Sequence, residues 1–241
     1  MQTGRGRWAW YGLLALNVIL IFVLTHHPQG RFHIWIRRHG EGFLVLAPSG
    51  RSLLVDGGSD AQALSTWVGN HLPPFIGRLD TAVLLSTDED VVAAQVAVFQ
   101  HEPPREGLRL SWTNNPTALA AWERGTSEVH VLDVGNLYRW EGFIIHTLTT
   151  TPPVLAFYVG TFRWLYMPQG CARNVHADVQ MWILGSWARC AEHAFPQWIV
   201  GDKTEDEAIA RALLTSPATR VFLGQGVHIV TDGLHYRWEG E

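Results

Sequence analysis

Four carboxylates offer the most direct chemistry in this sequence. Asp56 ends one apolar run, and Asp88, Glu89 and Asp90 follow the next one. If two strand ends bring them together, a site built from carboxylate oxygens suits Mg²⁺, Ca²⁺ or Mn²⁺ and not zinc. Such a site could hydrolyse phosphodiesters, including those of DNA. Asp56 could instead bind the backbone amides around Gly57-Gly58.

A structural interpretation of the second acidic run competes with the metal site. One of Ser86, Thr87 and Asp88 would cap the next helix through its side-chain oxygen. Glu89 and Asp90 would then occupy the first turn, where negative charge is favourable. Under this interpretation the run ends a loop and begins a helix, and it has no catalytic role.

Nucleophilic and phosphate-binding motifs have little support. Ser186 follows Gly185, but no His lies at a spacing from it that would indicate a catalytic base. The motif Gly-x-Ser-x-Gly is also absent. The sequence also has no Gly-rich phosphate loop of the Walker or dinucleotide type. Cys171 and Cys190 could pair in an oxidising compartment or remain independent core residues, and the sequence leaves both open.

Composition limits the class of protein further. The chain has 241 residues, 47% hydrophobic and 17% charged, which suits one domain with a short appendage and excludes disorder or a coiled coil. The formal charge of −4 excludes a binder that relies on a globally basic surface. Local arginines near aromatics could still form a groove for single-stranded nucleic acid, unless they are ordinary surface residues: Arg37, Arg38, Arg139, Arg163 and Arg237.

An apolar segment near the N-terminus predicts a membrane anchor. Residues 8–25 carry no charge, and a helix of that length spans about 27 Å, enough to cross a bilayer. Because Arg5 and Arg7 precede it, residues 1–7 are expected in the cytoplasm and the main domain outside. A cleaved signal peptide and a buried core helix are the alternatives, although no small-x-small cleavage site follows.

After a linker at 26–30, residues 31–241 alternate between strand and helix patterns. Alternating apolar residues predict a strand from Phe32, and Pro48-Ser49-Gly50 predicts the turn of a hairpin between 43–46 and 52–55. Helices are expected at 61–70, 91–99, from Pro116 onward and at 205–214. Further strands are expected at 79–85, 129–134, 143–148, 154–159, 162–167, 181–184 and 198–200, with a closing hairpin of 227–230 and 234–238. This mixture predicts an α/β sandwich.

The stretch 47–58, which ends in Asp56-Gly57-Gly58, resembles the strand-turn-strand opening of metallo-β-lactamase-fold hydrolases. Gly40 and Gly42 match the glycines of an Asp-Val-Gly-Gln-Gly-Asp motif in one branch, the C-terminal domain of ComEC-type competence channels, but both carboxylates of that motif are missing. Residues 226–233 resemble the terminal hairpin of the same domain. The resemblance covers about residues 31 to 238. It implies a metallo-β-lactamase-like αββα sandwich, here preceded by one transmembrane helix.

The metal ligands of that family are degenerate in this chain. Thr87 stands for the first His of the metal signature, Glu89 for its third position and Val91-Val92 for the closing Asp-His. Gln169 stands near the bridging Asp, and Ile183-Leu184 replaces a His-His pair. The resemblance thus implies a vestigial site made of Asp56, Gly57, Gly58, Thr87, Asp88, Glu89, Asp90, Gln169, Gly185 and Ser186.

These replacements determine the functional interpretation. Hydrolysis on this fold needs metal ions held by closely spaced imidazoles, but the 12 His residues include no His-x-His and no i, i+4 pair. We therefore expect no zinc, no catalytic residue, and a membrane-anchored pseudoenzyme that binds or scaffolds beside a DNA-uptake channel. Its expected partners are single-stranded DNA or a membrane protein. The alternatives are a phosphodiesterase or nuclease that uses the acidic residues with Mg²⁺ or Mn²⁺, and an envelope domain whose Trp-rich face docks a partner.

Overall fold

The computed structural model describes residues 11–18, 30–72, 78–111, 116–170, 179–185, 197–201 and 220–240. Residues 11–18 are helical and exposed, whereas residues 8–10 and 19–25 of the expected anchor lie outside the described residues. No helix in the described part of the chain is long and apolar enough to span a bilayer. The helix expected at 205–214, the residue Ser186 and both cysteines also lie outside that part.

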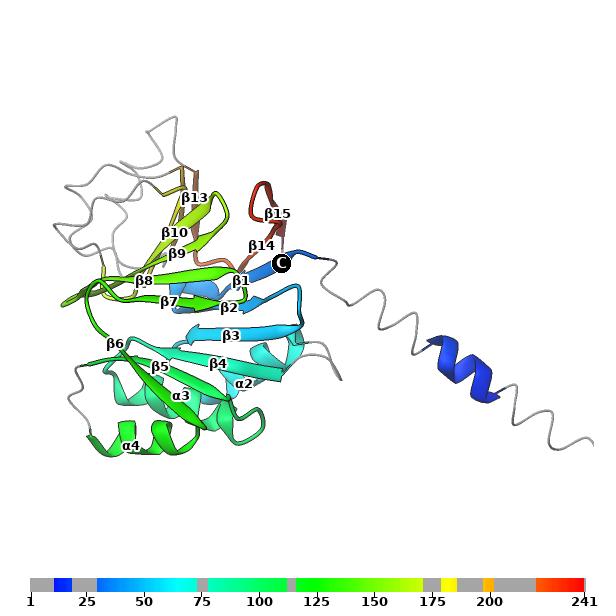
Figure 1. Ribbon diagram of the computed structural model, residues 1–241, viewed down its shortest axis with the longest axis horizontal. Coiled ribbons are helices and arrows are strands. Elements are labelled where there is room, and N and C mark those ends of the chain that lie inside the picture. Colours follow the sequence, from blue (N-terminus) through cyan, green and yellow to red (C-terminus); the bar gives the residue numbers. More distant parts are fainter. Residues whose placement is uncertain are drawn as a thin grey trace, which may run out of the picture.

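The described strands form two sheets that face each other (Figure 1). The first contains β1 (Phe32–Ile36), β2 (Gly42–Leu46), β3 (Arg51–Asp56), β4 (Arg78–Leu84), β5 (Glu106–Leu110), β6 (Glu128–Leu132), β14 (Val227–Thr231) and β15 (Tyr236–Gly240). The second contains β7 (Leu137–Trp140), β8 (Phe143–Thr150), β9 (Pro153–Val159), β10 (Phe162–Met167), β11 (Met181–Leu184), β12 (Trp198–Gly201) and β13 (Arg220–Leu223). The strand orders are β15-β14-β1-β2-β3-β4-β5-β6 and β13-β12-β11-β10-β9-β8-β7.

Each sheet is antiparallel on one side and parallel on the other. The first is antiparallel from β15 to β3 and parallel from β3 to β6. The second is antiparallel from β7 to β10 and parallel from β10 to β13. Parallel neighbours need crossover connections, and these connections begin at the carboxyl ends of the strands, where ligands bind in open α/β sheets.

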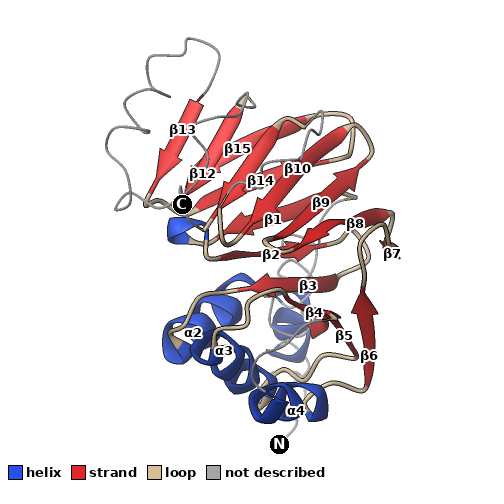
Figure 2. Ribbon diagram, turned by 90° about the vertical axis from the view of Figure 1, so that its left-hand side faces the viewer, coloured by secondary structure: helices blue, strands red, loops and turns tan. Residues whose placement is uncertain are grey.

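Helices cover the outer face of the first sheet (Figure 2). They are α2 (Ala61–His71), α3 (Glu89–Phe99) and α4 (Pro116–Arg124). The Asp60 carboxylate caps α2 by accepting a hydrogen bond from the N–H of Ala63 at 2.9 Å. Leu64 and Val68 of α2 pack on outward side chains of β2, β3 and β4, so the amphipathic face of the helix explains its place on the sheet.

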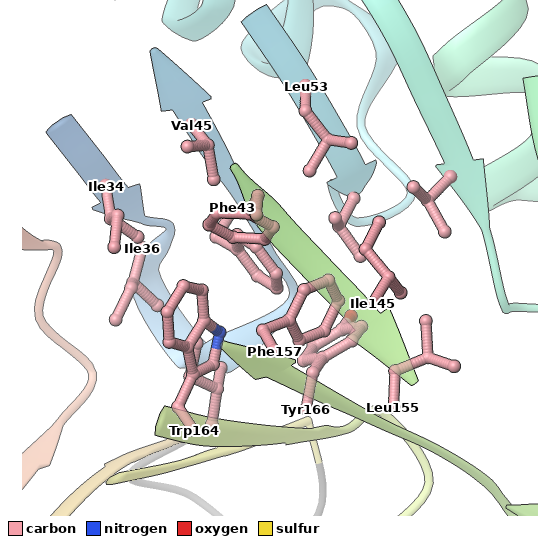
Figure 3. Close-up of a cluster of buried hydrophobic side chains, with 14 of the residues drawn as sticks. Ile34, Ile36, Phe43, Val45, Leu53, Ile145, Leu155, Phe157, Trp164 and Tyr166 are labelled. Carbon is pink, nitrogen blue, oxygen red and sulfur yellow. The ribbon is translucent and has the colours of Figure 1, made fainter. Parts of the chain in front are cut away.

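The main core lies between the two sheets (Figure 3). Alternate residues of β1 and β2 point inward and are fully buried, among them Ile34, Ile36 and Phe43. From the second sheet, Phe157 and Trp164 stack with ring centroids 5.4 Å apart, and Phe43 meets Phe157 edge-on at 5.0 Å. Burying each such side chain contributes roughly 1.5–3 kcal/mol, so this cluster holds the sheets together.

The predicted α/β sandwich is confirmed for the described residues, and its layering agrees with a metallo-β-lactamase-like arrangement. Most of the chain that connects β10 to β13, namely residues 171–178, 186–196 and 202–219, lies outside the described residues. The second helical layer of the αββα expectation therefore stays a prediction. The sequence patterns missed β5, β7 and β13. In β5 the cause is Gly107, a weak strand former, which is required because a Cβ there would lie 2.6 Å from the Trp122 ring.

Candidate functional site

A cleft of about 520 Å³ opens where the carboxyl ends of β3, β4, β10 and β11 meet. Asp56 is the last residue of β3, and the loop after β4 runs through Ser86 and Thr87 to α3. Pro168 and Gln169 follow β10, and Gly185 follows β11. The cleft is lined by Glu41, Asp56, Gly58, Ser59, Ser86, Thr87, Asp88, Val91, Tyr166, Pro168, Gln169 and Gly185.

Asp56 lies in the floor of this cleft and is 1% exposed. Its Oδ1 accepts hydrogen bonds from the backbone N–H groups of Leu85 at 2.8 Å and Ser86 at 3.3 Å. Burial raises the pKa of the Asp56 carboxyl to about 6, because desolvation outweighs the hydrogen bonds that favour the charged form. The carboxyl therefore changes charge close to neutral pH.

Tyr166 brings the second sheet to the same carboxyl group. Its hydroxyl donates to Oδ2 of Asp56 at 3.0 Å and also lies 3.1 Å from the carbonyl oxygen of Glu41. Figure 3 shows the ring reaching from β10 into the space between the sheets. Burial and the adjacent Asp56 charge raise the pKa of Tyr166 well above its ordinary value, so the phenol remains a hydrogen-bond donor.

A second layer of buried polar groups holds the backbone of Asp56. Gln95 of α3 donates from Nε2 to the carbonyl oxygens of Asp56 at 2.9 Å and Val83 at 3.0 Å. Trp122 of α4 donates from Nε1 to Oε1 of Gln95 at 2.6 Å. Asp56 itself has φ 46°, a left-handed conformation that Asp tolerates better than most residues. Two helices thus fix the position of the carboxyl.

The rim of the cleft beside Asp56 is formed by an ion pair. Nη1 of Arg37 lies 3.5 Å from Oε2 of Glu41 and also donates to the carbonyl oxygen of Gly57. The backbone N–H of Gly57 donates to the Glu41 carbonyl at 3.0 Å. A Cβ at Gly58 would lie 2.5 Å from Glu41 Oε2, and its φ of +79° also favours glycine.

The acidic run after β4 caps a helix. Oδ1 of Asp88 accepts from the N–H of Asp90 at 3.0 Å, and the Ser86 hydroxyl accepts from the N–H of Asp88 at 3.1 Å. Glu89 and Asp90 are exposed in the first turn of α3. The helix-cap interpretation is therefore confirmed for Asp88, Glu89 and Asp90. Of the four carboxylates, Asp56 and Asp88 line the cleft, and Glu89 and Asp90 do not.

The donor set does not fit the metal centre of the resembled family. Within the described residues no three His, Cys, Asp or Glu side chains form a group that could hold a metal ion. Ile183 and Leu184 are fully buried in apolar contacts, and Val91 lines the cleft, so these positions offer no ligand atom. Both oxygens of Asp56 already accept hydrogen bonds from the protein.

The structure brings together part of the site that the sequence predicted. Six of the expected residues line the cleft: Asp56, Gly58, Thr87, Asp88, Gln169 and Gly185. Gly57 contributes through its backbone, Glu89 and Asp90 lie outside the cleft lining, and Ser186 lies outside the described residues. Sequence reasoning missed Tyr166, whose place in an alternating strand suggests only a core residue. It also missed Glu41, although Glu41 stands between the two glycines of the resembled motif.

The arginines predicted to form one groove are dispersed. Arg37 is engaged with Glu41, and Nη2 of Arg237 lies 2.5 Å from Oε1 of Glu239. Arg139 lies on β7, at the edge of the second sheet farthest from β13. Arg38 shares a depression with aromatic residues. This second hollow, of about 330 Å³, is lined by Arg38, Phe222, Gly224, Gln225, Gly226, Val227, Trp238 and Glu239.

The fold of this chain was compared with solved structures, and its sequence with protein families and curated proteins. No protein-family model matches the sequence, and no curated protein matches it. Zn²⁺-bound PqqB from Methylobacterium extorquens is similar at 15% identity and a TM-score of 0.49, over 75% of this chain and 74% of that one. A metallo-β-lactamase from Hirschia baltica is similar at 15% identity and a TM-score of 0.37, over 51% of this chain and 57% of that one. The architecture assigned above rests on this chain's own strand order.

Proposed function

We propose that residues 31–241 form a metallo-β-lactamase-like domain that binds a ligand without metal catalysis, anchored at the membrane by residues 8–25. The observation that carries this proposal is the hydrogen bonding of Asp56. Leu85, Ser86 and Tyr166 donate to its two oxygens, so the carboxyl is held as part of the protein's internal structure. Among the described residues, no group of three His, Cys, Asp or Glu side chains surrounds this carboxyl to share a metal ion with it.

The lining of the cleft indicates the kind of ligand. Ser59, Ser86 and Thr87 supply hydroxyls, and Gln169 supplies an amide. Glu41 adds a carboxylate that is 40% exposed. The hydroxyls and the amide can donate or accept hydrogen bonds, whereas the ionised carboxylates of Glu41 and Asp56 only accept them. We therefore propose a small polar ligand that carries donor groups.

Metal content of the purified full chain tests the metal-independent assignment. After exchange into Zn²⁺, Mn²⁺ and Mg²⁺, elemental mass spectrometry should find metal well below one ion per chain, unchanged by Asp56→Ala. Asp60→Ala, an exposed helix-cap carboxyl on α2, is the matched control. Near-stoichiometric metal that Asp56→Ala alone removes would contradict the proposal and favour the metal-dependent phosphodiesterase.

The anchoring proposal rests on the uncharged run at 8–25 and on Arg5 and Arg7 before it. A single-pass anchor predicts that the chain stays with membranes after alkaline carbonate washing. It also predicts that a protease added to spheroplasts digests a C-terminal tag but spares an N-terminal one. Release of the chain by carbonate would contradict the anchor, and the reverse protection pattern would contradict the orientation.

A role beside a DNA-uptake channel remains part of the proposal through the second hollow. Phe222 and Trp238 stack there with centroids 5.0 Å apart and an interplanar angle of 21°, and Arg38 is exposed beside them. Aromatic rings with a nearby guanidinium suit single-stranded nucleic acid. Fluorescence anisotropy with oligothymidine should show salt-sensitive binding that Arg38→Ala weakens and Arg139→Ala does not. Unchanged affinity in Arg38→Ala would shift attention to a membrane-protein partner.

A further inference from the structure

Among the strands that the structure describes, none pairs with the outer edge of β6 in the first sheet. Within the described strands β6 ends the sheet order, with β5 on its inner side. The backbone N–H of Glu128 donates to the carbonyl of Arg105 on the β5 side at 3.0 Å. Because successive residues of a strand point their N–H and C=O groups to opposite sides, the backbone groups of Val129 and Val131 point outward.

Three exposed side chains on or next to this edge are apolar, alongside the polar Glu128 and His130. Val131 is 41% exposed, and Val134 and Leu137 on the connection to β7 are 60% and 59% exposed. Native edge strands are commonly protected by Lys, Pro or a bulge. The β6 sequence Glu-Val-His-Val-Leu has no Lys and no Pro, and its pairing to β5 continues from Glu128 to Leu132 without a register shift.

The residue order of β6 is complementary to itself in antiparallel pairing. A twofold axis at His130 places Val129 of each copy opposite Val131 of the other, so the same pair occurs once on either side of the axis. Since these are the residues with outward backbone groups, each pair exchanges two hydrogen bonds. Glu128 lies 3.4 Å from His130 within one chain. In the pair, Glu128 also becomes a diagonal neighbour of the other copy's His130, so its carboxylate can accept a hydrogen bond from that imidazole.

We propose that two copies of this chain associate through β6, which joins their first sheets into one continuous sheet across a twofold axis. The contact adds Val131, Val134 and Leu137 of each copy to a shared apolar surface. It involves none of the residues that line the cleft, so it is independent of the ligand proposal above.

Oligomeric state tests this interface on the full chain, purified in a mild detergent that covers residues 8–25. Analytical ultracentrifugation should show a protein dimer, and Val131→Lys should raise its dissociation constant about tenfold or more, because an edge lysine opposes strand pairing. Leu234→Lys is the matched control, since Leu234 is 70% exposed on the β14–β15 turn. A monomeric wild type at about 100 µM, or a dimer that Val131→Lys leaves unchanged, would overturn the proposal.

A crosslink tests the register separately. His130 meets its own copy in a pair without hydrogen bonds, with Cα atoms roughly 4.5 Å apart, a separation that a disulfide can bridge. In a Cys171→Ser, Cys190→Ser background, His130→Cys should form a covalent dimer under mild oxidation, and Leu234→Cys should not. A dimer that crosslinks equally through both positions would refute the β6 axis.

Discussion

Replacing Asp56 by Asn tests whether the floor of the cleft is a buried carboxyl held by protein donors. The amide oxygen of the introduced Asn would still accept from the N–H groups of Leu85 and Ser86. Its amide nitrogen would take the place of Oδ2 and donate to the Tyr166 oxygen, whose own proton can go to the Glu41 carbonyl. Asn also tolerates the left-handed backbone found at this position. The variant thus removes the charge and keeps the geometry.

The pH dependence of the wild type follows from the raised pKa of Asp56. Below about pH 4 the carboxyl is protonated in both the folded and the unfolded chain. Between about pH 4 and pH 6 the unfolded chain loses the proton while the folded chain keeps it, so stability falls as the pH rises. Above about pH 6 both are ionised and the loss is complete. The difference between 3.8 and about 6 corresponds to about 3 kcal/mol.

The Asn variant does not titrate, so its stability relative to the wild type should increase with pH. We expect the difference in the free energy of unfolding, variant minus wild type, to rise by about 3 kcal/mol from pH 4 to pH 8. Urea titrations of the full chain, followed by the fluorescence of its 12 Trp residues, measure this difference at each pH. Comparing the variants at equal pH cancels the other titrating groups.

Asp60→Asn serves as the matched control, because Asn caps a helix as well as Asp does. Its difference from the wild type should change far less across the same pH range. The reasoning about Asp56 would be refuted if the Asp56→Asn difference stayed constant within about 1 kcal/mol. It would also be refuted if the variant were strongly destabilised at pH 8, which is the expected behaviour of a lost metal ligand.

Three further variants test other buried groups. Burial lowers the pKa of His228 to about 4, so stability is lost as the pH falls from about 6.5 toward 4, and His228→Gln should reduce that loss in urea titrations. Trp122→Phe removes the donor to buried Gln95 and should lower the free energy of unfolding by about 1–3 kcal/mol at pH 7. Gly58→Ala crowds Glu41 and should lower that free energy, measured from thermal unfolding, by about 1–2 kcal/mol. Stabilities equal to the wild type would contradict each expectation.

Local signals predicted the elements that depend on neighbouring residues. The turn at Pro48-Ser49-Gly50 specifies the β2–β3 hairpin, and Asp60 caps α2, because turns and caps are bonds between residues a few positions apart. Local signals of this kind could not predict that β1 lies between β2 and β14. It depends on pairing Phe32 with Thr231 across the whole domain, which no periodicity encodes.

The site was predictable where it follows from topology and unpredictable where it follows from long-range contacts. Asp56, Thr87 and Gln169 come together because the carboxyl ends of β3 and β4 in the first sheet and of β10 in the second sheet open onto the same cleft. Tyr166 joins Asp56 across 110 positions in the sequence, and its burial pattern is that of an ordinary core residue. The acidic run serves the start of α3, where Asp88 caps the helix and Glu89 and Asp90 occupy its first turn.

The state of Asp56 at neutral pH supports a role for the cleft in binding. A carboxyl with a pKa of about 6 is mostly ionised at pH 7, although it is buried. The residues at the ligand positions of the resembled family carry no positive charge that would stabilise it. Asn would satisfy the same hydrogen bonds without that cost in stability. Departures from the most stable choice of residue concentrate at functional sites. We therefore propose that the Asp56 charge, which Leu85, Ser86 and Tyr166 hold in place, favours donor groups of a ligand that contacts the polar lining of the cleft.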